Sequence, residues 1–131
     1  MFILFELAEA DKVLRVTLKG EMTDDSVMEL WSTGVPVAAS FPAYRSIVDL
    51  SGITRFDVST RTINRLAKTD APNFSNRVFV APMDVVYGTT RMFQVLTEGT
   101  RKNVHVVRTM DEAYKLLGLE SPKFVAVDRA K

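Results

Sequence analysis

The spacing of hydrophobic residues near the start of the chain predicts a β-hairpin. Residues 2–8 form an apolar run, and the segment 13–19 places Leu14, Val16 and Leu18 on one face with polar side chains on the other. This period of two is typical of a half-buried strand. Only a short polar segment separates the two runs, so we expect the two strands to pair in antiparallel fashion.

Helical patterns alternate with short apolar runs through the rest of the chain. The predicted strands are residues 46–50, 77–81 and 104–107, and the predicted helices begin near Thr23, Ser59, Val85 and Thr109. A hairpin followed by alternating helices and short strands implies an α/β fold with one mixed sheet. We expect about five strands, parallel in their later part, and about four helices.

Residue spacing also predicts details of two helices. Gly34 and Pro36 are expected to break or kink the first helix, because proline lacks the N–H that a helix interior uses. In the third helix, the 3.6-residue period separates a buried side from an outward side. The predicted buried residues are Val85, Val86, Thr89, Met92, Phe93 and Leu96.

The pattern predicts one domain that spans residues 1–131. Its core is expected over about residues 2–118, with a C-terminal tail over residues 119–131. Within this tail, residues 124–127 fit either a strand or a packed helical turn, and the pattern does not choose between them.

Composition narrows the class of protein. The chain is 47% hydrophobic and 25% charged, and these values are typical of a globular protein. It has no cysteine, which excludes disulfides and thiolate chemistry. The net charge is only +1 and the basic residues are dispersed, which argues against nucleic-acid binding. The N-terminal segment lacks a basic leader and is too short to span a membrane, so we predict a cytoplasmic protein.

The segment 47–60, with the sequence IVDLSGITRFDVST, resembles the signature of STAS domains. In that signature, a strand ending in an Asp-Leu-Ser-Gly-like turn leads to an aromatic-Asp-Ser-Ser-Gly helix start. The order of the expected elements is also similar to that of STAS (anti-sigma-factor antagonist, SpoIIAA-like) domains over about residues 2–118. Residues 78–88 resemble a bacterial subgroup usually called STAS/SEC14-like.

The resemblance implies a regulatory role. It implies a non-catalytic module that contacts a protein partner, such as a regulatory kinase or an anti-sigma-like protein. The matching motif loop contains Asp49, Ser51, Gly52 and Asp57. In regulatory STAS proteins the second serine of the signature is phosphorylated, and Ser59 matches that position.

Two interpretations of Ser59 stay open. A phosphate on this side chain would meet the free N–H groups at a helix N-terminus. The alternative is that Ser59 or Asp57 simply caps the helix. The sequence departs from the signature at Val58, Thr60 and Arg61.

Exposed basic and aromatic residues form a candidate interaction surface. Arg61, Arg65 and Lys68 share one face of the second helix by their i, i+4, i+7 spacing. Tyr87 and Arg91 lie on the expected outward side of the third helix, and Tyr and Arg are over-represented at interfaces. This side of the helix is therefore a candidate for a homodimer contact or for docking of a partner. The alternative is an ordinary solvated surface.

The residues of catalytic sites are nearly absent from the sequence. Asp49, Asp57 and Asp84 follow predicted strands, but cap and turn roles explain them better than a metal site. His105 is the only histidine, and no nucleophile elbow or glycine-rich phosphate loop occurs. We therefore predict no catalytic residues, no metal, no cofactor and no enzymatic activity.

A second function stays open beside the regulatory one. The chain contains eight Phe and six Met residues, and the STAS/SEC14-like resemblance implies lipid-binding relatives. Phe41, Phe56 and Phe74 lie near predicted loops, where the mouth of a pocket could form. The alternative function is therefore a small apolar-ligand or lipid-binding protein.

Overall fold

A six-stranded mixed sheet forms the centre of this computed structural model, which describes residues 1–68, 76–98 and 103–127. The strand order is β5-β4-β3-β2-β1-β6. The strands are β1 (Phe2–Ala8), β2 (Val13–Thr23), β3 (Arg45–Asp57), β4 (Arg77–Val80), β5 (Val104–Val107) and β6 (Val125–Ala126). Strands β2 to β5 are parallel, and β1 is antiparallel to both of its neighbours.

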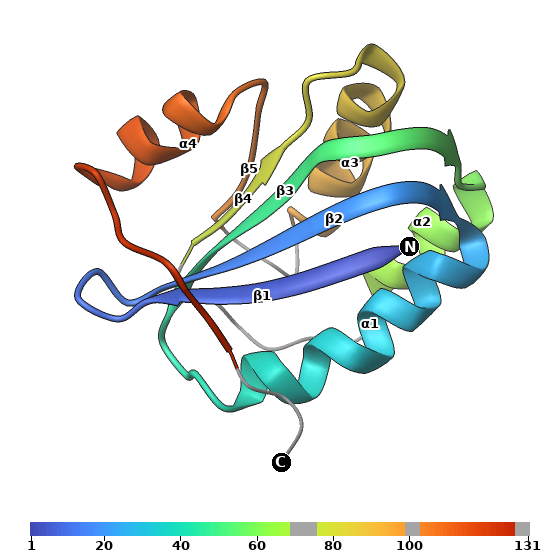
Figure 1. The fold of residues 1–131 in the computed structure, drawn as a ribbon. Coiled ribbons are helices and arrows are strands. Elements are labelled where there is room, and N and C mark those ends of the chain that lie inside the picture. Colours follow the sequence, from blue (N-terminus) through green and yellow to red (C-terminus); the bar gives the residue numbers. More distant parts are fainter. Residues whose placement is uncertain (69–75, 99–102, 128–131) are drawn as a thin grey trace.

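Four helices cover the sheet in the described part of the chain. They are α1 (Asp24–Ala39), α2 (Thr60–Lys68), α3 (Asp84–Thr97) and α4 (Met110–Leu117). Helices α1, α2 and α3 lie on one face, and α4 lies on the other (Figure 1). The predicted α/β fold, with an N-terminal hairpin followed by parallel strands, is confirmed.

Alternation along the strands divides the hydrophobic side chains between two cores. In β3, Ile47 packs with Ala113 and Leu117 of α4, whereas Leu50 packs with residues of α1, α2 and α3. Because successive side chains of a strand point to opposite faces, neighbouring residues serve different cores. The core on the side of α1, α2 and α3 is the larger one.

Strand β3 is longer than its apolar run. The sequence indicated a strand over residues 46–50, but β3 continues to Asp57 and pairs with β2 as far as Thr23. The register shifts between Thr17 and Lys19 and again between Gly20 and Glu21. Such irregularities interrupt the ladder locally, and the pairing of β2 with β3 continues beyond them in a changed register.

Helix α1 is continuous from Asp24 to Ala39, so Gly34 and Pro36 do not end it. Pro36 lies in the last turn, so the single hydrogen bond lost with its N–H falls close to the end of the helix, which continues to Ala39. Thr23 caps the start of α1, since its side chain accepts from the backbone N–H of Ser26. In the tail, β6 pairs with Glu6 and Leu7 of β1, which settles the open choice for residues 124–127 in favour of a strand.

The buried side of α3 differs from the prediction. Val85 and Leu96 are 54% and 42% exposed, whereas Thr90 and Thr97 are buried. Each threonine hydroxyl donates to the carbonyl oxygen four residues earlier, so its burial leaves no unsatisfied donor. The prediction followed the 3.6-residue period with Val85 and Leu96 on the buried side, whereas the buried side of α3 is rotated toward Thr90 and Thr97. No helix among the described residues has the length and apolar character needed to cross a membrane.

Candidate ligand cavity

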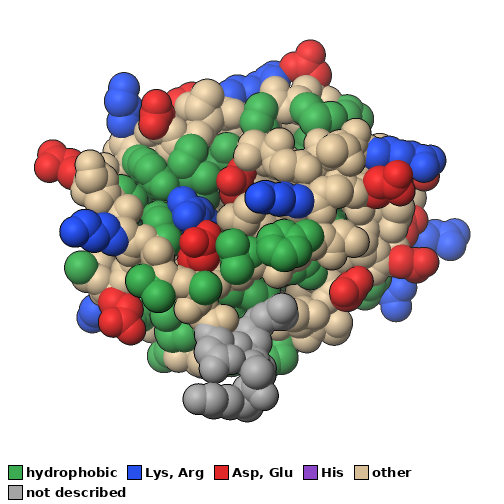
Figure 2. Space-filling model, viewed as in Figure 1, with side chains coloured by type: hydrophobic (Ala, Val, Ile, Leu, Met, Phe, Trp, Pro, Cys, Tyr) green, Lys and Arg blue, Asp and Glu red, His purple; other side chains and the backbone are tan. Residues whose placement is uncertain are grey.

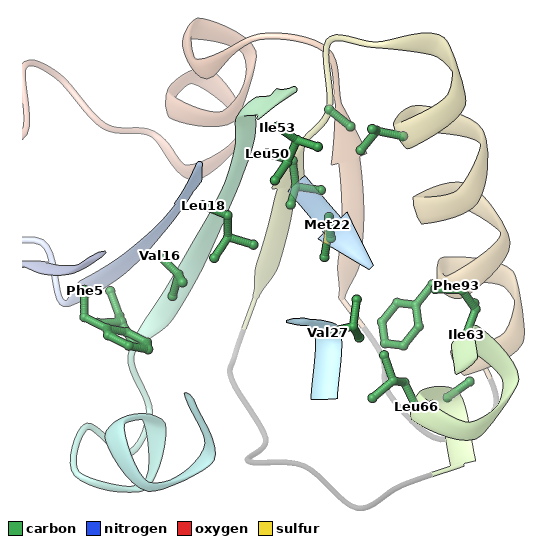
Figure 3. Close-up of a cluster of buried hydrophobic side chains, with 14 residues drawn as sticks. Phe5, Val16, Leu18, Met22, Val27, Leu50, Ile53, Ile63, Leu66 and Phe93 are labelled. Atoms are coloured by element: carbon green, nitrogen blue, oxygen red, sulfur yellow. The ribbon is translucent and has the colours of Figure 1, made fainter. Parts of the chain in front are cut away.

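A cavity of about 160 Å³ lies between the sheet and helices α1, α2 and α3. Residues of the sheet and of these three helices line it. They include Phe5, Val16 and Leu18 of the hairpin, Val48 and Leu50 of β3, Leu30, Trp31 and Gly34 of α1, Ile63 and Leu66 of α2, and Phe93 of α3. In Figure 3 the labelled side chains of the sheet and those of α2 and α3 point toward the same region.

Helix α1 covers this cavity with an apolar stripe. Leu30, Trp31, Gly34, Val35 and Ala38 recur at helical spacing and all line the cavity. Gly34 leaves space where another residue would fill it: a Cβ built there would lie 3.9 Å from the ring of Phe5, an ordinary contact. The cavity therefore owes part of its volume to a position that tolerates a larger side chain.

Four polar residues reach the cavity wall. Thr89 and Thr90 belong to α3, and each hydroxyl donates to a helix carbonyl, at 3.0 and 2.6 Å. Ser46 and Arg77 come from the sheet, at the amino ends of β3 and β4, and are directly paired in the parallel register. Ser46 Oγ is buried and has no hydrogen-bond partner in the described part of the chain. The other described residues of the wall are apolar. Because the threonine hydroxyls are already bonded within α3, Ser46 and Arg77 form the polar end of the cavity.

The candidate phospho-acceptor Ser59 lies at the start of α2, outside the cavity wall. Its hydroxyl accepts from the backbone N–H of Thr62 at 3.2 Å, as a helix cap does. Its backbone N–H donates to Asp24 Oδ1 at 2.8 Å. This N–H lowers the pKa of the Asp24 carboxyl, and the hydroxyls of Ser59 and Thr62 add to the shift. The capping role of Ser59 is therefore present, and phosphorylation stays a prediction.

The predicted motif loop is wrong, because Asp49, Ser51, Gly52 and Asp57 all lie within strand β3, which continues to Asp57 through its pairing with β2. Asp49 Oδ1 accepts from both the backbone N–H and the hydroxyl of Ser51, at 3.0 and 2.6 Å. A Cβ at Gly52 would lie 2.9 Å from the carbonyl oxygen of Leu18, so only glycine fits between the paired strands. Asp57 is exposed and approaches Arg55 at 4.0 Å. The motif thus shapes a bulged strand pair.

The candidate interaction residues are spread over two helices. Arg61, Arg65 and Lys68 are all exposed on α2, opposite the buried Ile63, Leu66 and Ala67. Arg91 is exposed on α3 and donates to Gln94 at 2.6 Å. Figure 2 shows basic and acidic side chains intermixed on the face it views, with hydrophobic side chains between them.

Tyr87 and Asp84 meet the same arginine. Arg108 lies over the Tyr87 ring, 3.9 Å from its centroid, and its Nη1 donates to Asp84 Oδ1 at 2.7 Å. These contacts join the start of α3 to the end of β5, and Tyr87 is half-buried beneath them. Over the described residues, no three His, Asp or Glu side chains gather to hold a metal ion.

The cavity uses residues that sequence reasoning did not single out. Phe56 lines it as expected for a pocket residue, Phe41 packs instead against Tyr44, and Phe74 lies outside the described residues. Ser46 and Arg77 were not identified. The sequence did contain a signal for Ser46. It lies two residues before Val48 and four before Leu50, so strand alternation places this polar residue on the same inward face as the two apolar ones.

Comparisons with known proteins add no assignment. The sequence matches no family model, and no curated protein shows significant similarity to it. The resemblance to STAS domains stays a prediction from the motif and the order of elements. Function has to be argued from the cavity and the surface, because fold alone does not determine function.

Proposed function

We propose that this chain is a non-catalytic binding domain that holds a small apolar ligand in the cavity between the sheet and helices α1, α2 and α3. The observation that supports this proposal is the cavity itself, with its volume of about 160 Å³ and its mainly apolar wall. Protein interiors are close-packed, and voids larger than a water molecule are few in a domain. A cavity of this size with a mainly apolar wall is therefore a candidate site for an apolar ligand.

The cost of leaving the cavity empty supports the same proposal. Side chains that line an unfilled space have no partner atoms on that side, so they lose dispersion contacts that a close-packed core would make. A bound apolar molecule would supply those contacts along the mainly apolar wall.

The size of the cavity limits the ligand. An apolar cavity of about 150 Å³ in another protein stays dry and binds benzene. The present cavity has nearly the same volume, so its ligand has on the order of six to ten non-hydrogen atoms. A long lipid chain would need the helices to move apart.

The test uses Trp31, which is the only tryptophan of the chain and lines the cavity. Toluene, titrated into the purified protein, is expected to change the emission of Trp31 in a saturable way. It should also raise the melting temperature, because a ligand that binds only the folded state stabilises it. A titration without saturation and without a thermal shift would contradict the proposal.

A matched pair of variants separates the cavity from the surface. Val48→Phe places a ring in the cavity and should abolish the response to toluene. Val95→Phe makes the same chemical change on the outside of α3, where Val95 is 57% exposed, and should leave toluene binding intact. Equal responses from the two variants would place the ligand elsewhere.

A regulatory module of STAS type that contacts a protein partner is the second candidate function. It is favoured by the three exposed cations of α2, Arg61, Arg65 and Lys68, which follow the capping residue Ser59. Clustered cations attract an acidic surface, mainly by speeding association. Homodimerisation through this module would belong to the same proposal.

Charge reversal tests this second function. The triple variant Arg61→Glu, Arg65→Glu, Lys68→Glu should lose any protein that co-purifies with the wild type from the native host. Its melting temperature should change little, since all three side chains are exposed. Co-purification that survives the triple change would rule out α2 as the contact surface.

A further inference from the structure

The hydroxyl of Ser46 has the features of an unused binding group. The residue is 2% exposed and is one of those that line the cavity, and its buried Oγ has no hydrogen-bond partner among the described residues. Burying a hydroxyl without a partner costs stability, and buried polar groups are almost always paired. A ligand atom in the cavity would supply the missing partner.

Arg77 brings positive charge to the same place. It is the residue of β4 that pairs with Ser46 of β3, and it too lines the cavity. Paired residues of neighbouring strands lie roughly 5 Å apart and project from the same face of the sheet. A guanidinium has five N–H donors in a planar fork, so it can hold a ligand while it keeps contacts within the protein.

Apart from this pair, the described wall is apolar except for Thr89 and Thr90, whose hydroxyls already donate to carbonyl oxygens of their own helix. Val48 and Leu50 follow Ser46 on the same face of β3, and Phe79 follows Arg77 on β4. A ligand that satisfies the whole wall needs a hydrophobic body and one compact group that accepts hydrogen bonds. A carboxylate is the best choice for this group. Its two oxygens can accept hydrogen bonds from the planar guanidinium, and a remaining lone pair can accept from the serine hydroxyl.

We propose that the ligand of this cavity is a compact apolar carboxylate, whose charged end meets the Ser46 hydroxyl and the Arg77 guanidinium at the amino ends of β3 and β4. This inference rests on the proposed function and specifies the chemistry of its ligand. The body of the ligand lies toward Val48 and Leu50. With on the order of six to ten non-hydrogen atoms, the class includes aryl and short-chain carboxylic acids.

The experiment compares benzoate with benzamide, which has the same shape and no charge. Titrations followed by Trp31 emission or calorimetry should give tighter binding of benzoate to the wild type. Ser46→Ala should weaken benzoate binding roughly tenfold, the usual effect of losing one hydrogen bond to a charged group. The same change should leave toluene binding unaltered.

Ligand-free stability provides an independent readout of the orphan hydroxyl. Ser46→Ala removes a buried group without a partner, so the melting temperature of the ligand-free protein should stay equal or rise. Ser51→Ala is the matched control, since Ser51 is an exposed serine of the same strand. It should leave benzoate binding unchanged. Arg77→Met should remove the preference for benzoate over benzamide. If Arg77→Met does not fold, the comparison of Ser46→Ala with wild type is sufficient to test the inference.

The outcomes separate this inference from the proposed function. Saturable toluene binding with no preference for benzoate, or with equal benzoate affinity in the wild type and Ser46→Ala, would overturn the carboxylate and leave the apolar cavity. Failure of benzoate, benzamide and toluene alike to bind would overturn both. Tight benzoate binding that Ser46→Ala weakens and Ser51→Ala spares would establish the site.

Discussion

Asp24 and Ser59, separated by 35 positions in the sequence, are joined by a hydrogen bond of 2.8 Å from the Ser59 backbone N–H to Asp24 Oδ1. Asp24 is the first residue of α1, and Ser59 caps α2. The bond therefore ties together the amino ends of two helices that cover the cavity. Neither residue lines the cavity. Substitutions at Asp24 or Ser59 can therefore perturb the helices that cover the cavity without changing a residue of its wall.

The pH dependence of this contact follows from the pKa of Asp24. The Ser59 N–H lowers that pKa in the folded state, so the contact stabilises the protein above the unfolded-state pKa. The contribution is lost as the pH falls through the lowered folded-state pKa. Asp24→Asn should be less stable than wild type at neutral pH, and the gap should close in acid. Urea unfolding from neutral to acidic pH measures this difference in the free energy of unfolding. Asp25→Asn is the control for loss of a negative charge in the first turn of α1.

Loss of the Ser59 cap should be measurable in the same way. Ser59→Ala removes the oxygen that accepts from the Thr62 N–H, and loss of such a cap costs about 1 kcal/mol. Ser59→Asp keeps a capping oxygen but places a second carboxylate next to Asp24, so it should recover only part of the loss. Chemical denaturation of the three proteins checks this order. Equal stability of Ser59→Ala and wild type would show that the cap contributes nothing.

Gly34→Ala should stabilise the protein and weaken its ligand binding at once. Replacing a helical glycine with alanine gains up to about 1 kcal/mol, and the new Cβ meets only the ring of Phe5, at 3.9 Å. The same methyl group enters the cavity and should reduce the affinity for toluene. Gly88→Ala is the matched control, because a Cβ there meets nothing within 4 Å. It should show the stability gain with unchanged toluene binding.

Gly52→Ala should destabilise the protein by roughly 1–3 kcal/mol, the usual cost of overpacking. The added Cβ would lie 2.7 Å from Cγ of Lys19 and 2.9 Å from the carbonyl oxygen of Leu18. The lysine side chain can move, but the backbone of β2 cannot move without disturbing its pairing with β3. Thermal melting compares this variant with Ser51→Ala, a change at the exposed neighbour. A melting temperature equal to that of the wild type would mean that the strands separate easily at the bulge.

The fold was predictable because its signals are local. Alternation in residues 13–19 marked the hairpin, and the cap at Thr109 with Glu112 three residues later marked the start of α4, where the Glu112 N–H does donate to the Thr109 hydroxyl. The apolar side of α3 was predicted less well. Thr90 and Thr97 rank as polar, and only the helix geometry shows that each can satisfy its own hydroxyl.

The cavity was harder to predict because it is space that the packed side chains leave unfilled, and this depends on the three-dimensional packing. Motif reasoning directed attention to the carboxyl ends of the strands, where ligands of open α/β sheets usually bind. Asp57 ends β3, and Asp49 lies in the middle of β3 beside Val80, the last residue of β4. The polar pair of the cavity lies at the opposite, amino ends. That the Ser46 hydroxyl has no partner within the described ranges is a property of the packed structure, and the residue pattern along the chain does not show it.

The long parallel pairing of β2 with β3 also has a consequence for how the chain folds. It joins Val13 to Arg45 at one end and Thr23 to Asp57 at the other, each pair roughly thirty positions apart. The entropy of closing such a loop is lost before the strand contacts form, whereas the turn between β1 and β2 closes over only a few residues. The hairpin is therefore expected to form early, and the rate of folding to be set by the docking of β3 against β2 across the whole of α1.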